Sequence, residues 1–351
     1  YRLEIPLETA YQLAYGDFEA VENAVVRVES DSGLTGWGCA APDPHVTGET
    51  VEGNLEVLRE GLVPALRRSG RSSFGELLGL VRESAPQHPA ARAALDLALH
   101  DLWGKQRGVP VPSLLGGAVR EIPTSITIGI MGVEETTAAA AQRLAEGFAI
   151  LKLKGGRDPE QDIEKVRAVR RNHGPEIGIR LDANQGYSVD QTLELVKRSK
   201  KARLQLIEQP TPRGQPELMA RISKQVPIPI MADESLMNLR DAFRLAKDDL
   251  VDMVNVKLMK VGGISEALHI NAVSRAAGFE VMVGCMDESA LAIAAGLHFA
   301  LARPNVVYAD LDGHIGLLGD PAEGAVLLRD GHLHPTGTPG LGFDLHALKK
   351  G

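Results

Sequence analysis

From residue 119 to residue 320, short apolar runs alternate with longer segments whose apolar residues have helical spacing. Eight of these runs have the length and the branched side chains of buried strands: 123–130, 148–154, 177–182, 203–208, 228–232, 252–256, 279–284 and 306–309. Each pair is separated by enough residues for a helix, for example Asp158 to Asn172. The alternation predicts an α/β fold, a (β/α)8-type (modified TIM) barrel. A doubly wound open sheet is the rival, and it is disfavoured because no GxGxxG follows the first run.

The first 118 residues have a different pattern, with more local strand pairing. Residues 1–5 and 23–29 alternate as strands do, residues 31–33 form a turn, and residues 34–39 form the returning strand. Residues 15–19 read as a glycine-containing loop between the first strands, and the pattern from 49 to 107 is helical. We therefore predict an α+β domain over 1–118, a barrel over 119–320, and a tail over 321–351 that packs back on the first domain.

The composition is that of an ordinary globular enzyme, with 44% hydrophobic and 24% charged residues. Aromatic residues make up only 4% and the formal net charge is −8, which disfavours a nucleic-acid partner. No apolar run approaches the roughly 18 residues needed to span a bilayer. Cys39 and Cys285 lie far apart and outside any CxxC. We therefore expect neither a disulfide framework nor a zinc knuckle, and a cytoplasmic location, with a homo-oligomer left open.

Two lysines end the second predicted barrel strand, in the stretch FAILKLKGG at 148–156. Lys152 and Lys154 are two residues apart, so their side chains point to the same face of a strand. Two neighbouring ammonium groups are costly unless an anion or a reaction uses them. The alternative is that both lysines simply reach solvent at the end of the strand.

Acidic side chains end the next three predicted strands, at Asp182, Glu208 and Asp233. They are 26 and 25 residues apart, about one βα repeat each, so the carboxylates should lie side by side at the C-terminal mouth of the barrel. Three carboxylates this close raise one another's pKa unless a cation neutralises them. An all-oxygen ligand set favours Mg²⁺ over zinc. The alternative is that each acid caps the helix that follows it.

Another lysine, Lys257, ends the sixth predicted strand, so Lys154 and Lys257 bracket the acids. If a substrate carboxylate binds the metal, the α-carbon of the substrate lies between these lysines. One lysine can then remove the α-proton and the other can return a proton from the opposite face, through an enediolate whose extra charge rests on the metal. Lys152 would lower the pKa of Lys154 and add positive charge near the enediolate. A salt bridge to a strand-end acid is the alternative role of Lys257.

Six motifs of the chain are familiar as a set: LKLKGG, LDANQG, IEQP, ADES, NVKLMKVGG and GCMDES. Together they resemble the enolase superfamily, specifically the muconate-lactonising-enzyme subgroup, over nearly the whole chain. The resemblance implies a capping domain, built from the N-terminal region and the tail, on a barrel that uses lysine and Mg²⁺ to form an enediolate. It implies that Asp182, Glu208 and Asp233 are the Mg²⁺ ligands and that Lys154 and Lys257 are the acid/base pair. It also implies a supporting role for Lys152 and a place near the metal site for Asn184.

The eighth predicted strand ends in Asp310-Leu-Asp312, which resembles the DxD signature of dipeptide epimerases. In those enzymes two aspartates hold the α-ammonium group of the dipeptide, and side chains at i and i+2 can both bond one ammonium. The resemblance thus implies a Mg²⁺-dependent epimerase that inverts the C-terminal residue of a dipeptide. Alternatives are an N-acylamino-acid racemase or o-succinylbenzoate synthase, a non-catalytic barrel that binds a small ligand, and, for the aspartates alone, a turn.

The acidic loop over residues 15–19 indicates which side chain the epimerised residue of the dipeptide carries. It carries Asp17 and Glu19, and no arginine or lysine lies between residues 3 and 26. Asp287 and Glu288, which end the seventh predicted strand, add negative charge near the substrate. An acidic side chain would be held poorly there. We expect a hydrophobic or cationic residue at the epimerised position rather than glutamate; the alternative is that these acids face solvent.

Overall fold

Eight parallel strands form the centre of the structure, a computed structural model that describes residues 1–13, 16–70, 73–118 and 120–345, without the side chains of residues 9–18. The strands pair in chain order: β5 Ile126–Ile128, β6 Ile150–Lys154, β7 Gly178–Asp182, β8 Leu206–Glu208, β9 Ile230–Ala232, β10 Met253–Lys257, β11 Glu280–Gly284 and β12 Val306–Asp310. A parallel bridge between Thr124 and Ala309 joins the two ends of this sheet. Each predicted barrel strand overlaps one of them, so the predicted barrel is confirmed.

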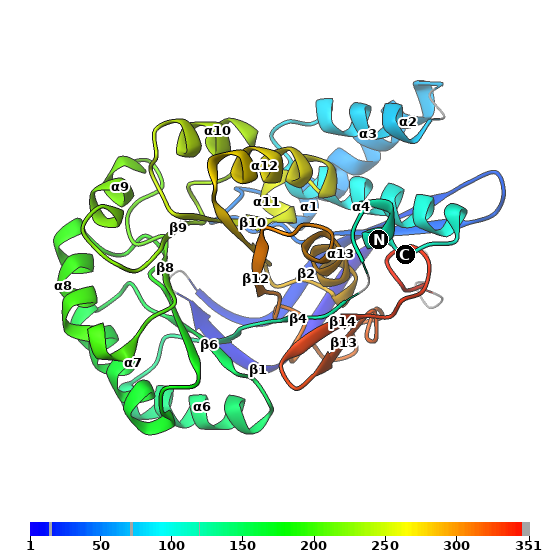
Figure 1. The fold of residues 1–351 in the computed structure, drawn as a ribbon. Coiled ribbons are helices and arrows are strands. Elements are labelled where there is room, and N and C mark those ends of the chain that lie inside the picture. The colour runs from blue at the N-terminus through cyan, green and yellow to red at the C-terminus, as the bar shows by residue number, and fades with distance from the viewer. Residues whose placement is uncertain (14–15, 71–72, 119, 346–351) are drawn as a thin grey trace.

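Helices cover the outside of the barrel and connect its strands: α6 Val133–Ala145, α7 Pro159–His173, α8 Val189–Ser199, α9 Glu217–Ser223, α10 Leu239–Lys247, α11 Leu258–Val261, α12 Ile264–Ala277 and α13 Ala290–Leu301, with a 3₁₀ turn, η2, at Lys200–Ala202. Figure 1 shows α6 to α10 as an arc around the strands. Asp158 starts α7 by accepting from the amides of Glu160 and Gln161. Within the described residues, β12 has no helix of this kind after it, and none of the helices is long and apolar enough to cross a membrane.

The N-terminal strands form a longer hairpin than predicted: β1 Arg2–Leu13, β2 Gly16–Glu29 and β3 Thr35–Ala40, all antiparallel. The prediction of a loop over 15–19 is wrong for residues 16–19, which belong to β2, and residues 16–18 pair with the end of β1. The sequence carried a signal for this arm, because apolar residues alternate along β1 from Leu3 to Leu13, and the predicted first strand ended too early at residue 5. The register shifts between Pro6 and Tyr11, and there Leu7 bridges to Leu317 in the segment after β12.

Helix α4, Pro89–Arg107, is the central element of the N-terminal region and is buried along most of its length. It ends at Gly108, whose φ of 69° is a left-handed cap that glycine adopts without strain. The remaining helical segments of this region are α1 Val51–Glu56, the π-helical turn η1 Val57–Leu62, α2 Val63–Arg68, α3 Phe74–Glu83 and α5 Val111–Leu114. Glycines of β3 face α4, and a Cβ at Gly38 would collide with the backbone of Ala94 and Ala98.

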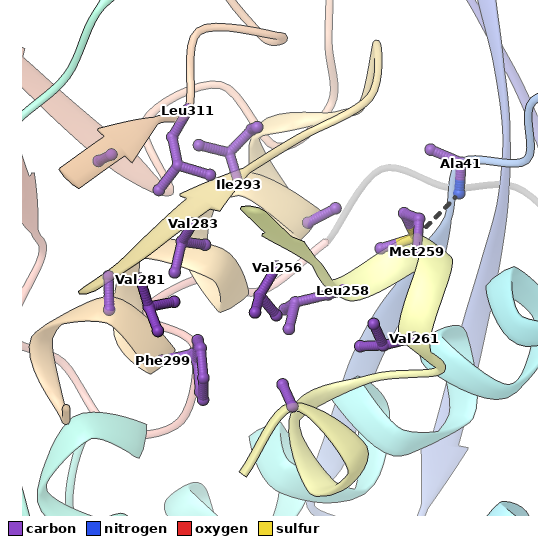
Figure 2. Packing of buried hydrophobic residues seen from close by; sticks show 14 of the residues in the cluster. Ala41, Val256, Leu258, Met259, Val261, Val281, Val283, Ile293, Phe299 and Leu311 are labelled. Atoms are coloured by element: carbon purple, nitrogen blue, oxygen red, sulfur yellow. Dashed lines mark hydrogen bonds between the residues drawn. The ribbon is translucent and has the colours of Figure 1, made fainter. Parts of the chain in front are cut away.

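The N-terminal region docks on the barrel beside the end of β10. The Asp96 carboxylate of α4 accepts from the amide of Ile264, at 2.7 Å, and so caps α12. The amide of Ala41, just after β3, lies 3.3 Å from the Met259 sulfur, and Figure 2 shows Met259 pointing toward it. These contacts fix the short helix α11, which directly follows Lys257, against the N-terminal region.

The C-terminal segment returns to both parts of the molecule. Strands β13 Val326–Arg329 and β14 His332–Pro335 form a small antiparallel sheet with β4 Ile122–Pro123, the segment that precedes the barrel. Further on, the amide of Leu341 donates to the Asp101 carboxylate of α4, at 2.7 Å. The tail therefore contacts α4 as well as the entry to the barrel.

We predict that Gly38→Ala lowers the free energy of unfolding by about 1–3 kcal/mol, because the added methyl group meets helix backbone that cannot move aside. Gly79→Ala is the matched control: Gly79 lies inside α3 with open space around it, so alanine should stabilise the protein by about 0.5–1 kcal/mol. Urea unfolding followed by circular dichroism measures both changes. Equal stabilities of the two variants would contradict the close β3–α4 packing.

Candidate active site

The predicted carboxylates come together at the C-terminal ends of adjacent strands. Lys154 of β6 pairs in register with Asp182 of β7, and Asp182 pairs with Glu208 of β8. Asp233 follows directly after β9, the next strand. All three carboxylates are buried. The spacing of one βα repeat therefore predicted their neighbourhood correctly.

Lys152 lies in the middle of this cluster and its side chain is only 3% exposed. Its ammonium nitrogen is 2.7 Å from Asp310 Oδ2, 2.9 Å from Glu208 Oε2 and 3.1 Å from Asp182 Oδ2. Burial alone would lower the pKa of Lys152, but the surrounding carboxylates raise that pKa well above its usual value. Lys152 is therefore a fixed positive charge.

Lys154 is more accessible and faces the same acid. Its ammonium nitrogen lies 2.8 Å from Asp182 Oδ2 and 3.1 Å from Asn184 Oδ1. Both lysines thus contact the same oxygen of Asp182, which agrees with the prediction that their side chains share one face of the strand. The chain can leave the strand tightly because Gly156 has a φ of 94°, and a Cβ there would collide with the carbonyl of Ala183.

Lys257 approaches the cluster from the other side, 3.0 Å from Asp233 Oδ2. Burial lowers the pKa of Lys257, and the Asp233 carboxylate more than offsets this, so the pKa is raised. A further lysine, Lys260, is fully buried and donates to the other Asp233 oxygen and, at 3.2 Å, to the carbonyl of Asn255. Lys260 was not predicted to have a role, although it is the second lysine of the motif NVKLMKVGG.

The acids have the chemistry of a divalent metal site. Glu208 is buried next to Asp182 and Asp233, and these conditions raise the pKa of its carboxyl group to about 8. One Glu208 oxygen accepts from the Asn255 amide at 2.8 Å. Among the described residues no three acidic, histidine or cysteine side chains already surround one point, and the ammonium groups of Lys152 and Lys257 lie against the carboxylates instead. The three carboxyl groups, of which Glu208 has a raised pKa, nevertheless form an oxygen-only donor set that fits Mg²⁺.

Asp310 and Asp312 lie at the end of β12, beside this cluster, and have different surroundings. Asp310 accepts from the Ser125 hydroxyl at 2.6 Å and from Lys152, so both of its oxygens already have partners. Asp312 accepts from the amide of Thr127 at 2.7 Å. Burial and the nearby Asp310 charge raise the pKa of Asp312 to about 6. Asp312 is therefore the carboxylate of the pair with more to gain from a cationic ligand.

The acids predicted near the substrate side chain are less closely grouped. Glu19 is exposed on β2, and the side chain of Asp17 lies outside the described residues. Glu288, after β11, is buried, and burial raises the pKa of its carboxyl group to about 8. The Asn23 side chain of β2 holds the backbone of this segment, because it accepts from the Ser289 amide at 2.8 Å and donates to the Asp287 carbonyl at 3.3 Å. Asn23 was not predicted; a lone asparagine in a strand gives no signal.

The chain matches two protein families. Residues 3–116 match the family described as "Mandelate racemase / muconate lactonizing enzyme, N-terminal domain", and residues 135–349 match the family described as "Enolase C-terminal domain-like". The chain is 42% identical to the L-Lys-D/L-Arg epimerase of Methylococcus capsulatus, over 96% of this chain and 95% of that protein. It is 37% identical to the hydrophobic dipeptide epimerase of Enterococcus faecalis, over 93% of this chain and 92% of that protein.

Solved structures show the same similarity. The substrate-liganded L-Ala-D/L-Glu epimerase of Bacillus subtilis superposes with a TM-score of 0.94 at 33% identity, covering 97% of this chain and 96% of that one. The dipeptide epimerase of Methylococcus capsulatus, complexed with Mg and the dipeptide L-Arg-D-Lys, gives a TM-score of 0.90 at 40% identity, covering 97% of both chains.

We predict that Mg²⁺ raises the melting temperature, because binding to the folded state adds about 2.7 kcal/mol of stability at a concentration 100 times the Kd. Glu208→Gln should abolish this shift while leaving the metal-free protein at least as stable, since it removes a buried carboxyl group whose pKa is raised. Glu234→Gln is the matched control, a buried acid one residue beyond Asp233, and should keep the shift. Thermal melts with and without EDTA measure the shift for each protein. A full Mg²⁺-induced rise in the melting temperature of Glu208→Gln would exclude Glu208 as a metal ligand.

Proposed function

The chain belongs to the mandelate racemase and muconate lactonizing enzyme family of the enolase superfamily, and from this premise we propose that it is a Mg²⁺-dependent dipeptide epimerase. It is an isomerase that inverts the α-carbon of the C-terminal residue of a dipeptide. The observation that carries the proposal is the placement of two lysines on opposite sides of one carboxylate cluster: Lys154 against Asp182 and Lys257 against Asp233.

The reaction is a 1,1-proton transfer between two bases. In one direction Lys154, in its neutral form, takes the α-proton, and the electron pair of the C–H bond moves into the carboxylate to give an enediolate. Lys257, as an ammonium, then donates a proton to the opposite face of the α-carbon. The reverse reaction exchanges the two roles, so each lysine acts on one stereoisomer.

Positive charge has to offset the second negative charge of the enediolate. Lys152 supplies part of it, because its ammonium group is held permanently charged among three carboxylates. Asp182, Glu208 and Asp233 would hold Mg²⁺, which would supply the remaining positive charge beside the substrate carboxylate. Asn184, bonded to Lys154 at 3.1 Å, orients that lysine.

The α-ammonium group of the dipeptide fits the acidic end of β12. Asp312 is half-buried with a raised pKa, so its carboxylate gains most when a cation compensates its charge. The substrates of an N-acylamino-acid racemase or o-succinylbenzoate synthase carry no cation for Asp310 and Asp312. A non-catalytic barrel gives the opposed lysines no role. These points favour the dipeptide epimerase over the other functions considered.

For the side chain of the epimerised residue we propose a cationic or hydrophobic group rather than a carboxylate. The relatives at 42% and 37% identity act on Lys/Arg and on hydrophobic dipeptides by their names. The sequence supports this preference, because the N-terminal hairpin carries Glu19 and no arginine or lysine between residues 3 and 26, which disfavours a glutamate side chain. The two thiols, both free, accord with the expected cytoplasmic location.

The substrate prediction is tested with a dipeptide panel in D₂O and Mg²⁺, with deuterium at the C-terminal α-carbon followed by NMR. We expect L-Ala-L-Lys and L-Ala-L-Leu to exchange at least about ten-fold faster than L-Ala-L-Glu, since a 1.4 kcal/mol difference in binding gives that ratio. N-succinyl-L-Lys, which lacks the α-ammonium group, is the control and should exchange slowest. Preferential exchange in L-Ala-L-Glu would refute the predicted side-chain preference.

Single lysine variants test the two-base mechanism. We predict that Lys154→Ala slows exchange of the α-proton in one stereoisomer of the substrate by about 100-fold or more. Lys257→Ala should slow exchange in the other stereoisomer by the same factor. The remaining lysine still exchanges the proton on its own face. Lys165→Ala, which removes a buried lysine of α7 outside the cluster, is the control. If each active-site variant slowed both stereoisomers equally, a two-base mechanism would be wrong.

A further inference from the structure

A guanidinium group is buried inside the barrel, below the active site. Arg180 of β7 is 2% exposed and contacts Met282, which belongs to a buried apolar cluster with Leu206, Met231 and Met253. Its contact with Met282 of β11, at 3.6 Å to the sulfur, crosses the interior, because β7 and β11 are not neighbours in the sheet. Moving a charge into such surroundings is costly, and an apolar side chain would fill the same space without that cost.

The direct partners of Arg180 are uncharged. Its nitrogens donate to Ala309 O at 2.8 Å, to Ser125 Oγ at 3.1 Å and to Gln205 Oε1 at 3.1 Å. Its guanidinium carbon lies 4.9 Å from the centre of the Tyr308 ring. Within the described residues no carboxylate lies at ion-pair distance from Arg180. Its charge therefore has to be balanced through an intermediate group.

That intermediate group is the Ser125 hydroxyl. Arg180 and Lys152 can only donate. The Ser125 hydroxyl lies 2.6 Å from the Asp310 carboxylate but 3.4 Å from the Ala309 carbonyl, so its proton goes to Asp310. Ser125 Oγ accepts from Arg180 and donates to Asp310 Oδ1 at 2.6 Å, and Asp310 Oδ2 accepts from Lys152 at 2.7 Å. Three buried side chains thus connect the base of the barrel to the central ammonium group of the active site.

We propose that Arg180, Ser125 and Asp310 form a hydrogen-bonded relay that positions Lys152 for the epimerisation. Burial raises the pKa of Asp310, but Lys152 above all, and then the Ser125 hydroxyl and the Arg180 charge, bring that pKa below its usual value. The bond from Ser125 also fixes the orientation of the Asp310 carboxylate. Asp310 in turn holds the Lys152 ammonium against Asp182 and Glu208. Arg180 and Ser125 are positioning residues, because neither touches the substrate, and this inference rests on the proposed function.

The competing explanation is that Arg180 and Ser125 only fill and stabilise the barrel interior. Ser125→Ala separates the two, because it removes one oxygen atom and leaves Arg180 in place. Ser199→Ala is the matched control: Ser199 is 1% exposed and donates to the Leu195 carbonyl within α8, away from the site. Both variants lose one buried hydroxyl, so their melting temperatures should fall by similar amounts.

We expect Ser125→Ala to lower kcat by about ten-fold or more in both reaction directions, with KM for the dipeptide changed by less than about three-fold. The reason is that Lys152 matters most when the second negative charge forms, which occurs in the transition state rather than in the bound substrate. Ser199→Ala should leave kcat unchanged. Arg180→Met in the Ser125→Ala background should add little further loss, since both changes interrupt the same relay.

Two results would overturn the relay: a kcat of Ser125→Ala within about two-fold of the control, or a kcat loss that only accompanies a larger fall in melting temperature. If the wild-type protein were inactive on every dipeptide of the panel, the proposed function would be refuted instead. Crystal structures of the wild-type protein and Ser125→Ala then decide the relay without activity. Displacement of the Lys152 ammonium from Asp182 and Glu208 in the variant supports it, and an unmoved ammonium refutes it.

Discussion

The ammonium group of Lys152, surrounded by three buried carboxylates, is the interaction on which the rest of the site depends. Asp182, Glu208 and Asp310 come from three different strands, and each lies within 3.1 Å of this one nitrogen. Without compensating charge these acids would repel one another and their pKa values would rise. Only a closed sheet of parallel strands presents so many strand ends to one point, so the charge cluster and the barrel require each other.

The lysines of the cluster fall into two groups that differ in burial and in function. Lys154 and Lys257 lie on the two flanks, each against an acid of its own, while Lys152 and Lys260 are more deeply buried. The flanking lysines can exchange protons with a substrate between them. The deeper ones hold carboxylates in place, Lys260 through Asp233 and Lys152 through Asp182 and Glu208. An epimerase needs this division, because its bases must change protonation state while the groups that stabilise the enediolate must not.

The N-terminal region contributes rigidity at the same face of the barrel. Asp96 of α4 caps α12, just beyond the segment that carries Lys257 and Lys260. Asn23 of β2 holds the backbone around Glu288. The barrel loops that bear functional residues are therefore fixed by polar contacts from a separate sheet and helix, and the close β3–α4 packing that glycines allow supports these contacts.

The strand–helix alternation could be predicted from the sequence, with C-terminal strand ends within two residues of those observed, and so could the neighbourhood of Asp182, Glu208 and Asp233. These follow from local periodicity and from one repeat length. The two lysines of β6 were also placed correctly, because side chains two residues apart share a face. The full length of the β1–β2 hairpin was missed, although apolar residues alternate along β1 as far as Leu13, because the predicted first strand ended at residue 5. Only the tertiary structure decided which groups bond to which: that Asp310 is engaged by Ser125 and Lys152, that Lys260 holds Asp233, and that Arg180 lies beneath them. Those contacts join residues far apart in the chain, and no periodicity encodes them, because closure of the barrel creates them.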